Sequence, residues 1–275
     1  MKKIIYDLGC NSGLNIPYYL LKSDLVVAVE ANTKLCEIIK IRFKKEIING
    51  RLVVENCVVT VLPENMNVDF YLHKHNDFLS QFLMPDKNIL GEYSKTKLPS
   101  KNIISIINYY GHPYYIKIDL EHYDSIILKE LLFKKIYPKY LSIESHTREI
   151  LNIIIQDSTY KSFKLVDGSQ VHKKYKNCVV NNNRYSFPKH SAGPFGNDID
   201  GHWLEKSNFC FLLSVIGFGA KDIHCSLEEK PSKYYLPLET ILYTKRKIIR
   251  RFVVIFITIL IVFALIYLPK IKDNH

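Results

Sequence analysis

The N-terminal stretch Asp7–Gly13 reads Asp-Leu-Gly-Cys-Asn-Ser-Gly and combines a carboxylate with glycines at fixed spacing. Glycines allow a tight turn and a close approach of the backbone to a ligand, where a Cβ atom would clash. The stretch does not match the dinucleotide fingerprint G-x-G-x-x-G, which seats a pyrophosphate on a helix N-terminus. A carboxylate two residues before the first glycine would repel a pyrophosphate but attract a cationic aminoacyl group. S-adenosylmethionine carries such an ammonium group and no phosphate, so the loop indicates this cofactor rather than NAD.

The next apolar run, Leu25–Glu30, ends on an acidic side chain. A carboxylate at the end of the second strand can accept hydrogen bonds from both hydroxyls of a ribose. Together with the glycine loop, Glu30 therefore predicts S-adenosylmethionine as the cofactor. The alternative is a structural turn that binds no ligand, because short D-x-G-x-x-x-G strings also arise by chance.

More acidic and imidazole side chains follow two later apolar runs, at the strand ends where open α/β sheets bind ligands. Methyl transfer from a sulfonium is an in-line displacement, so the enzyme must align the acceptor, exclude water and accept a proton from the hydroxyl. The candidates for the proton acceptor are Asp119, Glu121, His122, Glu144 and His146. His146 could equally be a surface residue, and for Lys117 a structural ion pair and a catalytic role are both open.

The elements that must position these residues form an α/β pattern, in which β-rich and helical runs alternate over residues 1–170. This alternation predicts a largely parallel sheet covered by helices. The expected strands are Ile4–Leu8, Leu25–Glu30, Arg51–Val59, Tyr114–Asp119, Tyr140–Glu144, Phe163–Asp167 and a last one around Ile223–Cys225, with an extended piece at Met66–His73. Four helices are expected. The first begins near Leu14, the second covers Thr33–Ile48, the third covers Tyr123–Phe133, and the fourth follows the fifth strand and runs through Ile155. A long loop over 172–203, rich in Asn, Lys, Gly and Pro, is expected to be functional.

Three stretches resemble the FkbM-type methyltransferase family over about residues 1–226. Ile116–Glu121, Ile-Lys-Ile-Asp-Leu-Glu, resembles the family's K-I-D-x-E-G, and Leu141–Glu144 follows at the next strand end. Ser191–Asp198, Ser-Ala-Gly-Pro-Phe-Gly-Asn-Asp, with Gly201–Trp203 and Asp222–His224 after it, resembles the S-G-P-F-G-E-D and D-I-H segments of one branch. The resemblance implies a Rossmann-like class I methyltransferase sheet of seven strands, mostly parallel with the last strand antiparallel. It also implies O-methylation, often of a sugar or polyketide hydroxyl.

The resemblance further implies roles for individual residues. The methionine end of the cofactor would lie on the Asp7–Gly13 loop, the ribose at Glu30, and the adenine near the end of the third strand. The implied cofactor-binding set is Asp7, Gly9, Cys10, Asn11, Gly13, Glu30, Asn56 and Cys57, and the implied catalytic set is Asp119, Glu121, His122 and Glu144. His122 departs from the family, which has a glycine there, so it either adds a base beside the reaction centre or occludes the pocket.

The C-terminal segment 252–269, FVVIFITILIVFALIYLP, has no charged residue and would give roughly 26 Å of helix, close to a membrane thickness. A buried core helix is the alternative. The basic residues just before it are Lys245, Arg246, Lys247, Arg250 and Arg251. By the positive-inside rule they place residues 1–251 in the cytosol, on a single-pass membrane protein. The predicted organisation is a methyltransferase domain over 1–230 with a substrate-side loop at 184–203, a basic juxtamembrane linker at 231–251 and an anchor at 252–269.

Composition limits the other partners. The formal net charge is +11, yet no basic motif interleaved with aromatics indicates nucleic acid. The six cysteines include no C-x-x-C pair, so no zinc spacing is present and no metal site is predicted. We therefore expect a membrane-attached O-methyltransferase for a glycan, glycolipid or other membrane-proximal hydroxyl. The alternatives are a methyltransferase for a protein or small molecule and a degenerate, non-catalytic scaffold. A nicotinamide oxidoreductase is disfavoured by Asp7.

Overall fold

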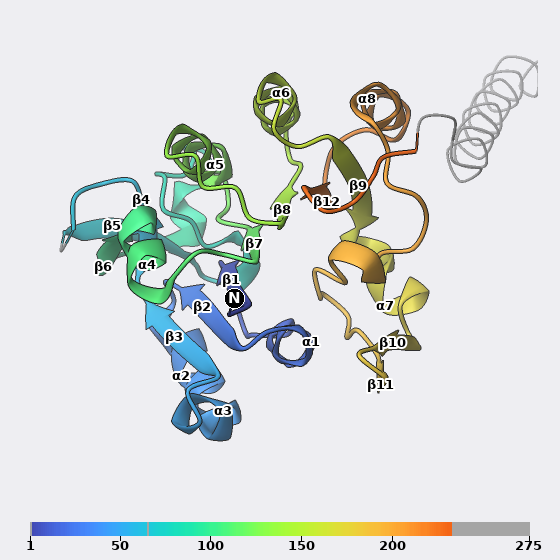
Figure 1. Ribbon diagram of the computed structural model, residues 1–275. Coiled ribbons are helices and arrows are strands. Elements are labelled where there is room, and N and C mark those ends of the chain that lie inside the picture. The colour runs from blue at the N-terminus through green and yellow to red at the C-terminus, as the bar shows by residue number, and fades with distance from the viewer. Residues whose placement is uncertain (1, 65, 233–275) are drawn as a thin grey trace, which may run out of the picture. The chain divides into compact units, whose positions relative to one another are not determined.

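A mixed sheet of seven strands runs through the larger unit of the chain in this computed structural model, which describes residues 2–64 and 66–232 (Figure 1). In spatial order its strands are β3 (Leu52–Asn56), β2 (Leu25–Glu30), β1 (Ile4–Leu8), β7 (Tyr115–Ile118), β8 (Tyr140–Glu144), β12 (Lys221–Ser226) and β9 (Ser162–Asp167). The pairs from β3 through β8 are parallel, and β12 is antiparallel to both of its neighbours. The predicted α/β sheet, mostly parallel with the last strand antiparallel, is confirmed.

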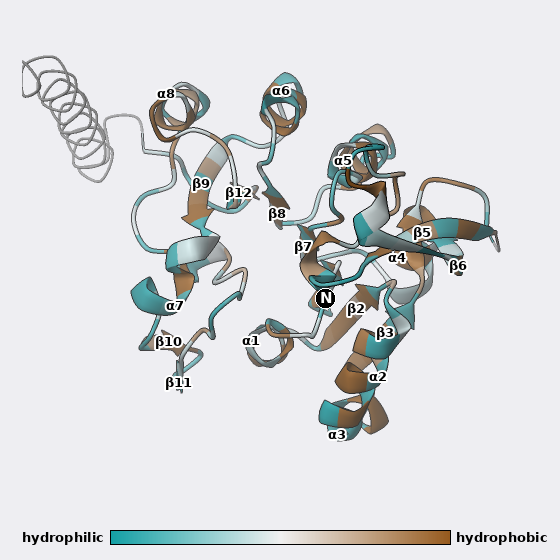
Figure 2. Ribbon diagram, turned by 180° about the vertical axis from the view of Figure 1, so that it is seen from behind, coloured by the Kyte–Doolittle hydropathy of each residue, from teal (hydrophilic) through white to brown (hydrophobic). Residues whose placement is uncertain are grey.

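Helices cover the two faces of this sheet. Figure 1 shows α1 (Ile16–Lys22) and α2 (Thr33–Arg42) on one side, and α5 (Asp124–Phe133) and α6 (Arg148–Gln156) on the other. Parallel strands that are covered on both faces read as unbroken apolar runs. Accordingly every residue of β1 and β2 is buried, and the ribbon of β2 is coloured as hydrophobic in Figure 2.

Two expected elements are divided in the structure. The helix expected over Thr33–Ile48 breaks at Phe43, whose backbone leaves the helical region, and α3 (Lys44–Ile48) follows it. The strand expected over Arg51–Val59 ends at Asn56, and a separate β4 (Val58–Thr60) joins another sheet. The third strand therefore ends before the apolar run that its composition indicates is complete.

A second sheet, in the order β4-β6-β5, lies beside the first and was only partly predicted. The extended piece expected at Met66–His73 is β5 (Asn67–His73). Its partner β6 (Tyr93–Asn102) and the helix α4 (Ile103–Tyr110) were not expected. β5 and β6 pair antiparallel along the whole length of β5.

The segment 172–203 is ordered around short elements and buried aromatic rings. It contains the end of α7 (Val171–Lys174) and a hairpin of β10 (Cys178–Val180) and β11 (Asn183–Tyr185). Phe195 is fully buried and stacks on Tyr115 with ring centroids 3.9 Å apart, and Trp203 is also buried. Both rings therefore pin the segment to the body of the fold.

The remaining helical elements are the 3-10 turns at Asp77–Leu79, Leu90–Glu92, Gly168–Gln170 and Gly196–Asp198, and α8 (Lys206–Ile216). None of the helices within 2–64 and 66–232 has the length and apolar character that a membrane span requires. The predicted anchor at 252–269 and nearly all of the predicted linker at 231–251 lie outside the described residues.

Candidate functional site

A cavity of about 490 Å³ opens at the carboxyl ends of the parallel strands. Eight of the twelve residues in the implied cofactor-binding and catalytic sets line it, and they are Gly9, Cys10, Asn11, Glu30, Cys57, Asp119, Glu121 and Glu144. Four others, Asp7, Gly13, Asn56 and His122, are not among its lining residues. The strand-end residues thus converge on one site, whereas the other four have different surroundings.

The two glycines of the first loop are required by chain packing. Gly9 has φ +77°, and a Cβ there would lie 1.8 Å from the backbone oxygen of Asp119. Gly13 has φ +73°, and its Cβ would lie 2.8 Å from Cδ1 of Ile16 in the core. Gly9 therefore lets the ends of β1 and β7 approach each other at the cavity wall, while Gly13 lets α1 pack.

The carboxylate of Glu30 forms part of the cavity wall and is held by backbone donors. The amides of Asn11 and Asn32 donate to its two oxygens at 2.9 and 2.8 Å. A carboxylate offers about four lone-pair positions, so each oxygen can still accept a hydroxyl. Burial raises the pKa of Glu30 to about 7, and the amide donors only partly oppose this shift. Asn56 supports the same corner, because its side-chain amide donates to the backbone oxygen of Glu30 at 3.1 Å.

A buried lysine occupies the space between the ends of β1 and β7. The Nζ of Lys117 lies 2.8 Å from Oδ2 of Asp119 and 3.7 Å from Oδ1 of Asp7. Asp7 is fully buried, and neither of its oxygens has a hydrogen-bond partner among the described residues. Burial raises the pKa of Asp7 to about 6, and the Lys117 ammonium opposes that shift. Asp7 therefore faces Lys117, and Lys117 has the structural ion pair that the sequence left open.

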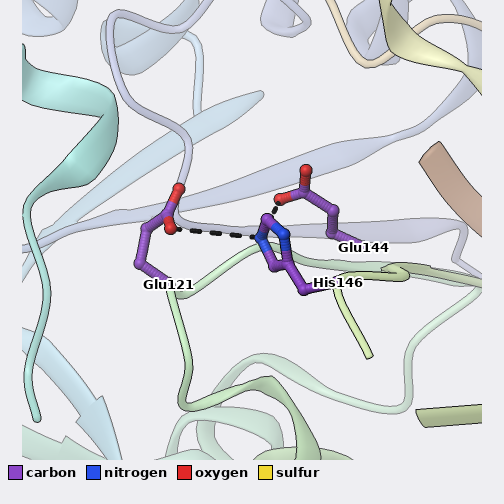
Figure 3. A group of neighbouring side chains, drawn as sticks. All are labelled: Glu121, Glu144 and His146. Carbon is purple, nitrogen blue, oxygen red and sulfur yellow. Dashed lines mark ion pairs between the residues drawn. The ribbon is translucent and has the colours of Figure 1, made fainter. Parts of the chain in front are cut away.

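Glu121, Glu144 and His146 come together in what we call the carboxylate–imidazole cluster (Figure 3). The Nε2 of His146 lies 2.8 Å from Oε2 of Glu144 and 4.0 Å from Oε2 of Glu121. Burial, with the charges of Asp119 and Glu144, raises the pKa of Glu121 to about 8. The bond to Glu144 raises the pKa of His146 to about 9. Groups that can exchange protons are thus gathered at the edge of the cavity.

His122 has φ 72°, in the left-handed region that favours glycine. Its side chain is exposed, and its ring centroid lies 6.0 Å from that of His146. Because His122 does not line the cavity, Asp119 and Glu121 still border open space. Of the two alternatives left open for His122, occlusion of the pocket is not observed.

The 184–203 loop contributes to the site through one short part. Residues 189–192 line the cavity, whereas the carboxylate of Asp198 bonds to the Tyr18 hydroxyl and the Lys22 ammonium at 2.8 and 2.7 Å. The carboxylate of Asp198 is therefore part of the anchoring of the loop.

Several lining residues were missed by the sequence reasoning. Asp77 and Phe78 come from the turn after β5, and the Phe78 ring lies 5.6 Å from the ring of His190. Asp222, at the start of β12, lies opposite Glu144 in the strand pairing and also lines the cavity. Asp222 carried a signal in the Asp-Ile-His stretch, whereas the turn at Phe78 carried none.

No protein-family model and no curated protein matches the sequence. Among solved structures, the chain is similar to a methyltransferase FkbM from Methylobacillus flagellatus, with 15% identity and a TM-score of 0.41. That match covers 60% of this chain and only 39% of the other. The C-terminal domain of precorrin-6Y C5,15-methyltransferase from Rhodobacter capsulatus matches with 9% identity, a TM-score of 0.39, and coverage of 82% and 79%. An O-methyltransferase from Bacillus cereus in complex with SAH matches with 10% identity, a TM-score of 0.37, and coverage of 82% and 74%.

Proposed function

We propose that the chain is an S-adenosylmethionine-dependent O-methyltransferase of the FkbM type. Its acceptor in this proposal is the hydroxyl of a glycan, glycolipid or other membrane-proximal molecule. The observation that carries the proposal is the Glu30 carboxylate, held by the amides of Asn11 and Asn32 in the wall of a cavity of about 490 Å³. The carboxylate stands beside the glycine turn after β1, where its free lone pairs can take the two hydroxyls of a ribose.

The sheet order supports this cofactor over a dinucleotide. The order expected for a six-stranded dinucleotide-binding sheet is 3-2-1-4-5-6, with all strands parallel. In this chain β12, the last strand of the main sheet along the sequence, lies between β8 and β9 and is antiparallel to both. That is the arrangement implied by the resemblance to class I methyltransferases.

The other lining residues suit the rest of the cofactor. Cys57 and the Phe78 ring border the cavity on the side of the second sheet, where an adenine would find an apolar surface and the carboxylate of Asp77 could accept from its amino group. Asp119 and Asn11 border the end nearest β1 and β7. Bound S-adenosylmethionine would supply an electrophilic methyl group on a sulfonium.

The acceptor would enter beside the carboxylate–imidazole cluster. Glu121 and Glu144 line the cavity, and the hydroxyl can be activated at these groups because they accept hydrogen bonds from it. The pKa of Glu121, raised to about 8, is near the pH at which general acid–base groups work best. The chain's task is then to align the hydroxyl with the methyl group and to keep water out.

Isothermal titration calorimetry of the full chain in detergent micelles tests the cofactor assignment. We expect S-adenosylmethionine to bind, and Glu30→Gln to weaken binding by about ten- to a hundredfold, the value of hydrogen bonds to a charged acceptor. Glu37→Gln is the matched control, since Glu37 is an exposed carboxylate on α2 that pairs with Lys40. Gly9 is unsuitable for this test, because any side chain there meets the backbone of Asp119.

Two results would contradict the proposal. Absence of S-adenosylmethionine binding by the folded wild-type chain would favour the non-catalytic scaffold. Tighter binding of NAD than of S-adenosylmethionine would favour an oxidoreductase. The acceptor is tested separately, by comparing methylated products in cells with and without the protein.

A further inference from the structure

The donor atoms of the carboxylate–imidazole cluster have the types and spacing of metal ligands. One oxygen of Glu121, one oxygen of Glu144 and one ring nitrogen of His146 all lie within 4.8 Å of one another (Figure 3). An ion about 2.0–2.2 Å from each of three donors holds them about 3–4.4 Å apart. Small rotations of the side chains would therefore bring all three into coordination distance.

The charges around the cluster leave room for a cation. Lys117 is already bonded to Asp119 at 2.8 Å, and His146 is bonded to Glu144 at 2.8 Å. Glu121 lies 4.0 Å from the His146 nitrogen, which is too long for a hydrogen bond. Asp222, the strand partner of Glu144, also lines the cavity, and its side chain makes no hydrogen bond or ion pair with the described residues. Among the described residues, the side chains of Glu121 and Asp222 thus line the cavity without a hydrogen bond, and Glu121 has only the long ion pair with His146.

The position of the cluster leaves coordination sites open. Glu121 and Glu144 line the cavity, while His146 stands at its edge with a third of its side chain exposed. Three protein ligands with open remaining positions are typical of catalytic metal sites rather than structural ones. Mixed oxygen and imidazole donors suit first-row divalent ions such as Mn²⁺, Fe²⁺ or Zn²⁺ better than Mg²⁺, which prefers oxygen alone.

We propose that Glu121, Glu144 and His146 form a binding site for a divalent transition-metal ion, with Asp222 beside it. The binding of the ion is independent of the proposed function, whereas its role rests on that function. In that role the acceptor hydroxyl oxygen takes an open position on the ion, which lowers the pKa of the hydroxyl. Glu121 and Glu144 would then ligate the ion instead of accepting the hydroxyl proton, which would leave to solvent as the hydroxyl binds. The oxygen would bond to the methyl carbon, and the sulfur would keep the electron pair of the broken carbon–sulfur bond.

The test is to titrate Mn²⁺ into the metal-free full chain in detergent micelles. The electron paramagnetic resonance signal of free Mn²⁺ measures how much of the ion is bound. We expect saturable binding of one Mn²⁺ per chain below about 1 mM, displaced by Zn²⁺ more readily than by Mg²⁺. Glu144→Gln and His146→Gln should each weaken binding by at least about tenfold. Glu149→Gln should not, because Glu149 is an exposed carboxylate on α6 that pairs with Lys129.

The variants are compared only where their thermal unfolding matches that of the wild type, and Glu121→Gln replaces any variant that fails this check. Absence of saturable Mn²⁺ binding by the wild type would overturn the proposal, as would equal binding by Glu144→Gln and His146→Gln. S-adenosylmethionine is titrated in parallel on the same samples. Mn²⁺ binding without S-adenosylmethionine binding would leave the metal site standing and remove the proposed methyl transfer.

Discussion

At the scale of single residues, Lys117 accounts for the acidic residue that opens the glycine loop. Asp7 and Lys117 are register partners on the neighbouring strands β1 and β7, and opposite charges on paired positions attract. Asp119 follows two residues later on the same strand face and takes the lysine directly at 2.8 Å. Although burial lowers it, the pKa of Lys117 is raised well above its usual value by Asp119, Asp7 and Asp222. The sequence interpretation of Asp7 as a direct ligand of the cofactor therefore has a competing structural explanation.

His224 gives a prediction that concerns pH. It lies in the middle of β12 and is 2% exposed, and within the described part of the chain its Nε2 has no hydrogen-bond partner. Burial, with the charge of Lys164, lowers its pKa from 6.5 to about 3. A depressed histidine pKa means that the unfolded state binds the proton first, so the stability contribution is complete above pH 6.5 and is lost as the pH falls toward 3.

We expect the free energy of unfolding of the wild type to fall more steeply than that of His224→Leu between pH 6.5 and 4.5. The difference in slope should approach roughly 1.4 kcal/mol per pH unit, the value for one proton. Urea unfolding of both proteins at pH 7, 6 and 5 measures this difference in slope. The carboxylates that titrate in this range are the same in both proteins, so their contribution cancels. Parallel slopes would show that His224 does not titrate in this range.

At the scale of elements, the strands predicted best are those buried on both faces. β1, β2 and β8 have the boundaries read from the sequence, because each is an apolar run that ends on or beside a polar residue. β6 was missed because its segment, Tyr93–Asn102, carries lysines and a proline and is stabilised by pairing with β5. α4 was missed because its isoleucines and tyrosines are typical of strands. Local sequence does not record pairing between distant segments.

The same distinction holds for the candidate site. Glu30, Asp119 and Glu144 were predicted to meet because the carboxyl ends of parallel strands share one edge. Phe78 was not predicted, since it reaches the cavity from a turn whose place depends on the second sheet. His146 was a candidate, but only the fold brings its ring within 2.8 Å of Glu144.

Substitutions at two phenylalanines distinguish a residue that anchors the loop from a residue that binds the ligand. Phe195 is fully buried and does not line the cavity, so Phe195→Ala should lower the free energy of unfolding by about 3–5 kcal/mol. Phe78 lines the cavity with 45% of its surface exposed, so Phe78→Ala should weaken S-adenosylmethionine binding and change stability by less than about 0.5 kcal/mol. Urea unfolding and calorimetry on both variants measure the two effects. The reverse pattern would contradict both assignments.

At the scale of the whole molecule, the chain combines the catalytic elements proposed above with an apolar C-terminal segment. Segment 252–269 has no charged residue, and five basic residues stand within 245–251 just before it. A continuous apolar run of this length favours a membrane span, and the basic cluster favours a cytosolic location for the residues before the span. The proposed membrane attachment is thus independent of the proposed methyl transfer, because the two depend on different residues.

Removal of residues 245–275 tests this independence. We expect the full chain to sediment with membranes and to stay there in 1 M salt, which screens charges to within about 3 Å and releases proteins held by electrostatics alone. The truncated chain should appear in the supernatant and bind S-adenosylmethionine within about twofold of the full chain, since the lining residues of the cavity all precede residue 223. A chain with the five basic residues replaced by glutamine, but with 252–269 intact, is the matched control and should still sediment. Release of the full chain by salt, or sedimentation of the truncated chain, would show that 252–269 is not the anchor.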